Sequence, residues 1–306
     1  MTLFQAIILG IVQGLTEFIP ISSTAHLVFA ARAVGLYDGI ENTLKAEQTT
    51  ATIAVIQLGT LLAVLIYFAR DILNISRAFL LDHLALLRRP RKLDGTSEQI
   101  IDSKPSGSRL SHDAWLGWLV IIGSIPVGIV GLVFKKQIEG TFTKNLWVIA
   151  TMMIVVAILL GIAELVGKRD RSMKELTIRD ALAVGIAQVL ALIPGSSRSG
   201  STMMGGLFAG QTRETAARFS FLLSIPAIAA SGLLELKEAI EKLPTDTYFY
   251  LAVATAVSGL VGYLSIWFLL RFLRTHSTGI FIGYRLIVGA CILLALAGGY
   301  IIAGVN

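Results

Sequence analysis

Long apolar runs alternate with short polar segments along this chain of 306 residues. Six of the runs are close to or above the ~18 residues that a helix needs to cross a bilayer. They lie at about 49–69, 114–134, 146–167, 217–234, 247–270 and 281–304. This pattern predicts an all-α polytopic membrane protein with six transmembrane helices.

Two further apolar stretches, about 3–30 and 181–210, have a different pattern because a proline followed by serine-rich sequence interrupts each of them. Both carry polar residues at positions that would lie at membrane depth. Non-helical backbone at that depth is tolerated only where it is buried in protein or lines a cavity. We therefore expect two re-entrant helix pairs in addition to the six spans.

The two broken stretches also resemble each other. GIVQGLTEFIPISS (Gly10–Ser23) matches GIAQVLALIPGSS (Gly185–Ser197) with one residue deleted in the second copy. Each copy is followed by three spans, and an odd number of spans forces the two copies to insert with opposite orientation. We predict a single membrane domain, 1–306, built as an inverted repeat of about 1–167 and 175–306. The alternative is chance similarity between two apolar, serine-containing stretches.

Composition supports the membrane assignment. Hydrophobic residues make up 55% of the chain and charged residues only 15%, against about 25% charged in soluble domains. This excludes a soluble enzyme, a disordered chain and a nucleic-acid binder. A single cysteine, Cys291, excludes a disulfide framework or a cysteine-based metal site.

Basic residues predict which loops face the cytoplasm. Fifteen Lys and Arg residues lie in 70–112, 168–180 and 271–280, against seven in the facing loops. The positive-inside rule places the three richer segments in the cytoplasm and both termini outside. Within the first of them, 89–112 is polar and is expected to be a flexible connector without chemistry.

The first broken stretch carries a set of polar residues that suits nucleophilic chemistry. Gln13 and Glu17 are four residues apart and share one helix face. Pro20 ends that helix, and a hydroxyl cluster and the only histidine of an apolar segment follow; these are Ser22, Ser23, Thr24 and His26. A carboxylate, hydroxyls and an imidazole are the parts of a nucleophile-plus-base site. The alternative is a capped helix with a satisfied polar cluster.

The second broken stretch has the features of an anion site. A glycine-flanked turn that opens a helix offers backbone N–H groups and hydroxyl donors, and Arg198 adds a fork suited to phosphate oxygens. The candidate ligands around it are Gly195, Ser196, Ser197, Ser199, Gly200 and Thr202. A helix-packing motif of small residues would explain the glycines but not an arginine at membrane depth.

Together the two stretches supply what phosphoryl transfer needs, since anionic oxygens must be clamped while a nucleophile is aligned. Glu17 has no acidic neighbour, so it can act as a base or as one ligand of a Mg²⁺ or Ca²⁺ ion shared with phosphate.

With these motifs, the sequence resembles a known family, the bacterial undecaprenyl-diphosphate phosphatases linked to bacitracin resistance. QGLTEFIPISSTAH (Gln13–His26) is similar to the family's acidic motif, and PGSSRSGST (Pro194–Thr202) to its PGxSRS motif. The run AVIQLGTLLAV from Ala54 and the pair Tyr284–Arg285 are similar to two further helices of the family.

The resemblance implies removal of the terminal phosphate from undecaprenyl diphosphate, which recycles the lipid carrier for peptidoglycan synthesis in the bacterial cytoplasmic membrane. It implies dependence on a divalent cation and a pocket that opens to the extracytoplasmic side. By position, Glu17 and Gln13 match the acidic motif, and Gln13 can be only a neutral ligand. Ser23 and His26 match the nucleophile and acid/base region, and Arg198 matches the phosphate-binding arginine.

Several alternatives stay open. Either Ser23 or His26 can be the nucleophile. The prenyl tail of the substrate is expected to lie along an apolar groove between helices. Arg285 and Glu164 are weaker candidates for the site. Arg285 is expected instead to snorkel to the cytoplasmic surface, and Glu164 to be either exposed or paired with a helix neighbour. The rival function is a polyprenyl-phosphate flippase or another inverted-repeat transporter, and a homodimer is a further candidate assembly.

Overall fold

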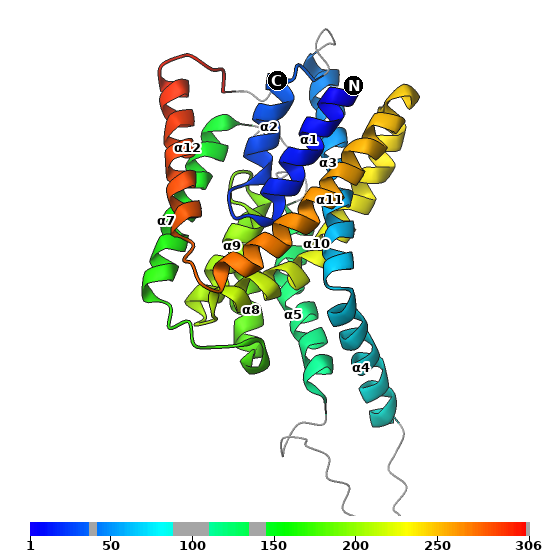
Figure 1. Ribbon diagram of the computed structural model, residues 1–306, viewed down its shortest axis with the longest axis vertical. Helices are drawn as coiled ribbons and strands as arrows, with labels where there is room; N and C mark the ends of the chain where they lie inside the picture. The colour runs from blue at the N-terminus through cyan, green and yellow to red at the C-terminus, as the bar shows by residue number, and fades with distance from the viewer. Residues whose placement is uncertain (37–41, 88–109, 135–144, 304–306) are drawn as a thin grey trace, which may run out of the picture.

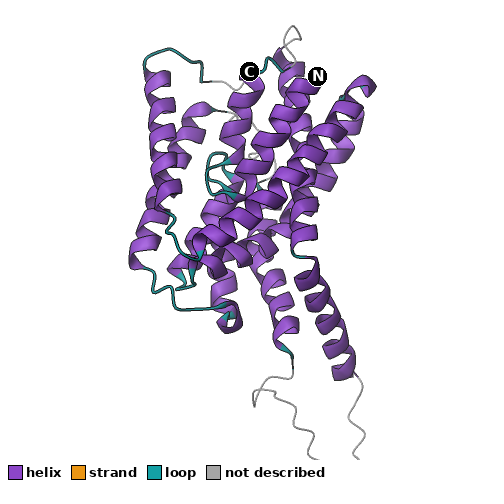
Figure 2. Cartoon of the chain, viewed as in Figure 1, coloured by secondary structure: helices purple, strands orange, loops and turns teal. Residues whose placement is uncertain are grey.

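The structure is a computed structural model, and it describes residues 1–36, 42–87, 110–134 and 145–303, with side chains of 42–47, 231, 233–235 and 237–242 left aside. In these ranges the chain is helical and forms no strand (Figure 2), and Arg171 and Gln211 make an isolated bridge. The long helices are α1 (Leu3–Phe18), α2 (Ser23–Ala33), α3 (Asn42–Tyr67), α4 (Ala69–Leu87), α5 (His112–Val133), α7 (Leu146–Val166), α8 (Ile178–Val189), α9 (Arg198–Phe208), α10 (Arg213–Lys242), α11 (Tyr248–Leu273) and α12 (Gly279–Ala297). Three short 3-10 turns add Met173–Glu175, Leu190–Leu192 and Thr245–Thr247.

The prediction of an all-α polytopic membrane protein is confirmed. Among the described residues, five helical segments are long and apolar enough to cross a membrane; they are Gln48–Tyr67, His112–Val133, Leu146–Val166, Thr245–Leu273 and Gly279–Ala297. The sixth predicted span, 217–234, lies within α10 and is not one of these five. The six-plus-two topology and the boundaries of the inverted repeat therefore stay predictions.

Both broken stretches form helical hairpins. In Figure 1, α1 runs inward from the end of the molecule where both termini lie, and α2 returns toward that end. From the opposite end α8 runs inward, and α9 turns back from the middle of the molecule. We call 19–22 the first tip and 193–197 the second tip. Each tip contains a proline, which ends the preceding helix because it cannot donate the next helical hydrogen bond.

The hairpins are held by close helix contacts. The first hairpin helix, α1, packs against α11, and α3 packs against both α10 and α11. At the α3–α11 crossing, a Cβ on Gly59 would lie 2.1 Å from the carbonyl oxygen of Thr255. Only glycine permits so close an approach, which is the usual device of helix packing in membranes.

The predicted cytoplasmic segments can be placed only in part. The loop between α7 and α8, which contains 168–177, lies at the end of the molecule opposite to the termini (Figure 1). Much of 70–112 is helical rather than loop, since α4 continues to Leu87. The connector predicted at 89–112 falls mainly on 88–109, which lies outside the described residues.

Candidate active site

A carboxylate lies at the end of the first helix of the first hairpin. Glu17 is 8% exposed in the last turn of α1, and its Oε2 accepts from Gln13 Nε2 at 3.0 Å and from Ser23 Oγ at 2.8 Å. Its Oε1 accepts from Gln57 Nε2 of α3 at 3.4 Å. The predicted Gln13–Glu17 helix face and the Glu17–Ser23 neighbourhood are thus both present, and Ser23 is within reach of a general base.

The second hairpin brings a cation to the same carboxylate. Arg198, the first residue of α9, places NH1 3.4 Å from Glu17 Oε1 across 181 positions of sequence. The next residue, Ser199, donates to the backbone carbonyls of Glu17 and Ile19 at 3.3 and 3.4 Å. The two broken stretches therefore meet, and a small cleft between them is bordered by Glu17, Arg198 and Ser199 together with Ser220 and Ser224 of α10.

Both tips hold serines in an unusual backbone conformation. Ser22 has φ +78° and Ser197 has φ +67°, and each directly precedes the return helix of its hairpin. A residue with a side chain pays on the order of 1–3 kcal/mol in such a conformation, which tends to occur at functional sites. Gly195 has φ +91°, and a Cβ there would lie 2.1 Å from the Ile149 carbonyl oxygen.

The serine hydroxyls at the two tips differ in their hydrogen-bond partners. Ser197 caps α9 by accepting from the N–H of Gly200 at 3.2 Å. The Oγ atoms of Ser22 and Ser196 are buried and have no hydrogen-bond partner. Such groups are rare in proteins, so the two hydroxyls are candidates for contact with a polar ligand.

His26 bonds on both ring nitrogens. Nδ1 lies 2.7 Å from the carbonyl oxygen of Ser22, which can only accept, so Nδ1 carries the proton. Nε2 lies 2.7 Å from the hydroxyl of Tyr284 in α12, and the two rings stack with centroids 5.6 Å apart. In the neutral imidazole, Nε2 therefore accepts from Tyr284.

Arg285 does not snorkel, and that expectation was wrong. Its side chain is fully buried, with 0% exposure, and it donates to five backbone carbonyls. These belong to Pro20 of the first tip, to Gly195 and Ser196 of the second tip, and to Met152 and Met153 of α7. The guanidinium lies inside the bundle because these carbonyls replace its hydration.

Glu164, the other residue left open, is buried and paired rather than exposed. It accepts from Arg213 Nε of α10 at 2.6 Å, from Arg169 at 3.1 Å and from Thr278 Oγ1 at 2.7 Å. This cluster joins α7, α10 and the start of α12, and the residues around Glu17 do not take part in it.

The remaining predicted site residues lie in different surroundings. Thr24 is exposed on α2. Thr202 is buried and bonds to the carbonyl of Arg198 at 2.7 Å and to Ser220 Oγ of α10, which ties α9 to α10. Gly200 lies against Arg285, since a Cβ there would be 2.9 Å from NH1.

Gln57, Thr60 and Tyr284 contact the site, although the residue pattern alone did not select them. Gln57 and Tyr284 entered only through the family resemblance, and Thr60, 3.5 Å from Gln13 Nε2, was not selected as a site residue. The available signal was a polar residue inside an apolar span, which is a functional candidate by default.

The donor set suits a hard divalent cation only in part. Among the described residues, no three His, Cys, Asp or Glu side chains gather to hold a metal. Glu17 and Gln13 are oxygen ligands of the type that Mg²⁺ and Ca²⁺ prefer, so a bound phosphate would have to supply the rest.

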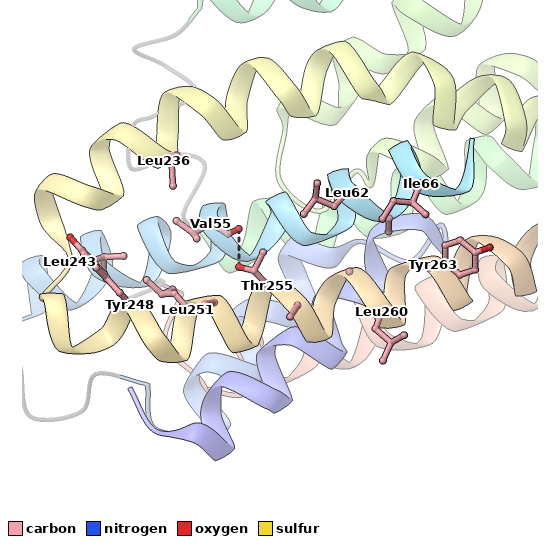
Figure 3. Close-up of a pocket in the computed structure, with 14 residues that line it drawn as sticks. Val55, Leu62, Ile66, Leu236, Leu243, Tyr248, Leu251, Thr255, Leu260 and Tyr263 are labelled. Atoms are coloured by element: carbon pink, nitrogen blue, oxygen red, sulfur yellow. Dashed lines mark hydrogen bonds between the residues drawn. The ribbon is translucent and has the colours of Figure 1, made fainter. Parts of the chain in front are cut away.

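An apolar cavity lies apart from the Glu17 cluster. A groove of about 710 Å³ runs between α3, α10 and α11 (Figure 3). Val55, Leu62 and Ile66 line it from α3, whereas Gln57 and Thr60 leave the opposite face of that helix. Leu236 of α10 and residues of α11 such as Leu251 and Tyr263 complete the walls.

The fold and the site define the class of this protein. It is a polytopic helical membrane protein in which two helical hairpins bring a carboxylate, a hydroxyl and a guanidinium together. The family model described as "Bacitracin resistance protein BacA" matches residues 6–291, and the chain belongs to this family.

Curated relatives carry the name undecaprenyl-diphosphatase. The chain is 52% identical to the one from Syntrophobacter fumaroxidans, with 96% of this chain and 97% of the relative covered. It is 44% identical to the one from Chlorobaculum tepidum, with 99% and 100% covered. For the one from Mycolicibacterium gilvum, identity is 43%, with 99% and 100% covered.

Proposed function

We propose that this chain is an integral-membrane undecaprenyl-diphosphate phosphatase, which releases inorganic phosphate and leaves undecaprenyl phosphate. The observation that carries the proposal is the position of Glu17, whose two oxygens contact Ser23 on one side and Arg198 of the other hairpin on the other. The activity named for the relatives, which align over nearly the whole chain, supports it.

The site supports a two-step phosphoryl transfer. Arg198 and the N–H groups of the second tip hold the phosphates, because cations and backbone donors stabilise charge on the transferring oxygens. Glu17 takes the proton of Ser23 as Ser23 Oγ bonds to the terminal phosphorus and the bridging P–O bond breaks. Undecaprenyl phosphate departs, and water then cleaves the phosphoserine to give serine and inorganic phosphate.

The alternative nucleophile is His26. Its Nε2 would have to part from the Tyr284 hydroxyl before it could attack phosphorus, whereas Ser23 already contacts its base. This difference favours Ser23. Acid lability of a trapped phosphoenzyme decides between the two, since phosphohistidine is lost in acid and phosphoserine is retained.

We expect a divalent cation, Mg²⁺ or Ca²⁺, to be held by Glu17 with Gln13 and by substrate oxygens. It would neutralise charge on the diphosphate. Because Arg198 also contacts Glu17, the ion and the guanidinium would share one carboxylate.

The apolar groove offers a place for part of the prenyl tail. It borders α3, which also carries Gln57, and its lining is almost wholly hydrocarbon (Figure 3). Ala256→Phe should then raise KM for undecaprenyl diphosphate and leave KM for a short-chain prenyl diphosphate unchanged.

We place the termini outside on the basis of the distribution of basic residues. Membership of the family supports the bacterial cytoplasmic membrane as the location and a pocket that opens to the extracytoplasmic side. Cysteine-accessibility labelling of a Cys291→Ala background tests this orientation. A homodimer, which light scattering in detergent would reveal, is a separate prediction.

The decisive experiment is phosphate release from undecaprenyl diphosphate by purified protein in detergent. Hydrolysis needs no second compartment, whereas a flippase moves lipid between two leaflets and releases nothing. Phosphate release lost in Glu17→Gln supports the enzyme. Transport in vesicles without phosphate release would support the flippase instead. Overproduction should also raise bacitracin resistance of the host.

A further inference from the structure

We infer that Arg285 is a positioning residue that holds the second tip in its phosphate-binding form. The inference rests on the proposed function, because it concerns the phosphate site used there. It does not make Arg285 a catalytic residue, since the guanidinium is buried beneath the tips and bonds to backbone carbonyls only.

The contacts of Arg285 connect three parts of the fold at one point. NH2 donates to the carbonyls of Gly195 and Ser196 at 3.0 Å each, and NH1 donates to the carbonyl of Pro20 at 3.3 Å. Nε donates to the Met153 carbonyl of α7 at 3.1 Å. One side chain of α12 therefore fixes both tips relative to each other and to a transmembrane helix.

These bonds set the direction of the peptide groups in the second tip. The C=O and N–H of a trans peptide point in opposite directions. Because the Ser196 carbonyl points to Arg285, the N–H of Ser197 points away from it. The first N–H groups of α9 have no helical partner, and among the residues that the structure describes only that of Gly200 is seen to bond, to the hydroxyl of Ser197. Arg285 thus orders the acceptors on one side of the turn and leaves donors on the other.

The contacts also explain why an arginine is needed. Among the described residues no carboxylate pairs with Arg285, so its charge is balanced by carbonyl dipoles. A planar fork with five donors can reach carbonyls on three sides, whereas the lysine ammonium has three donors at one point. We expect lysine to keep the charge and lose the geometry.

Gly200 provides an independent way to disturb the same contact. A Cβ at this position would lie 2.9 Å from Arg285 NH1 and 3.3 Å from Ser197 Cβ. Gly200→Ala should therefore push the guanidinium away from the tip without changing any polar group.

The test measures inorganic phosphate binding and turnover for Arg285→Lys, Gly200→Ala and the double variant, each in detergent. We expect each single variant to bind phosphate about tenfold more weakly, with KM rising more than kcat falls, as lost bonds to a charged group predict. The double variant should be little worse than either single variant because both act on one contact. Arg274→Lys, which changes an exposed arginine paired with Glu214, is the matched control and should behave as wild type.

Phosphate affinity and KM at wild-type levels in both single variants would overturn the inference, and so would fully additive losses in the double variant. Melting temperature separates misfolding from mispositioning: if Arg285→Lys unfolds, Gly200→Ala alone decides. Failure of the proposed function looks different, because wild-type protein would then bind phosphate and release none from undecaprenyl diphosphate.

Discussion

The two hairpins are alike in sequence and opposite in chemistry. Each consists of a helix that carries Gly-Ile-x-Gln in its second half, a proline turn and a return helix that follows a serine of positive φ. The first presents the carboxylate of Glu17 and the hydroxyl of Ser23, and the second presents Arg198 and backbone donors. Phosphoryl transfer requires a group that accepts a proton and a group that holds charge, so one such hairpin is insufficient.

The matched glutamines show how far the two hairpins have diverged. Gln13 donates to Glu17 at 3.0 Å. Gln188, at the same place in the second copy, is buried, and neither of its amide atoms has a hydrogen-bond partner. A polar position retained in both hairpins therefore supports the carboxylate in only one of them.

The largest expected effect comes from removing the carboxylate at the point where the two hairpins meet. Glu17→Gln keeps the shape but removes the base for Ser23 and the partner of Arg198, and we expect kcat to fall about 10³-fold. Phosphate release from undecaprenyl diphosphate measures it. The control is Glu175→Gln, an exposed cap outside the hairpins. Near-normal turnover in Glu17→Gln would remove the chemical difference between the hairpins.

The corresponding change in the second hairpin is Arg198→Lys. It keeps a positive charge but loses the two-pronged geometry that suits phosphate oxygens, so we expect kcat/KM to fall about 10²-fold. Most of the loss should appear in KM, in contrast to Glu17→Gln. Equal effects on kcat in Arg198→Lys and Glu17→Gln would contradict the assignment of phosphate binding to the second hairpin and proton transfer to the first.

Tyr284→Phe tests the contribution of α12 to the first hairpin. It removes the hydroxyl at His26 Nε2 and keeps the stacked ring. If Ser23 is the nucleophile, activity should fall less than about tenfold, because only the orientation of the imidazole is disturbed. If His26 is the nucleophile, freeing Nε2 should raise the yield of acid-labile phosphoenzyme, and single-turnover trapping measures that yield.

The smallest and most specific comparison uses the two glutamines. Gln13→Leu should lower activity several-fold, because Glu17 loses a donor while its charge stays buried. Gln188→Leu should leave activity unchanged and raise the melting temperature, since it removes buried polar atoms without partners. Thermal unfolding in detergent and phosphate release measure the two effects. A similar loss of activity in both variants would contradict the asymmetry.

Much of the fold followed from the sequence because it is encoded locally. Apolar runs set five membrane-length helices, and the prolines at 20 and 194 set where the hairpins turn. The polar set of the first hairpin was predictable as well, since Gln13 and Glu17 lie one helical turn apart. The span predicted at 217–234 lies in α10 and includes residues whose side chains are left aside here, so it stays a prediction.

By itself the sequence determined the membrane-spanning helices, the two interrupted stretches and the residue types at their turns, because periodicity and proline act over a few neighbouring positions. Only the tertiary structure decided that Arg198 contacts Glu17 across 181 positions of sequence and that Tyr284 forms a hydrogen bond with a ring nitrogen of His26. It alone also decided that Arg285 lies buried against both tips. The physical reason is that a buried charge is tolerated only where distant backbone groups converge on it, and no local pattern records that convergence.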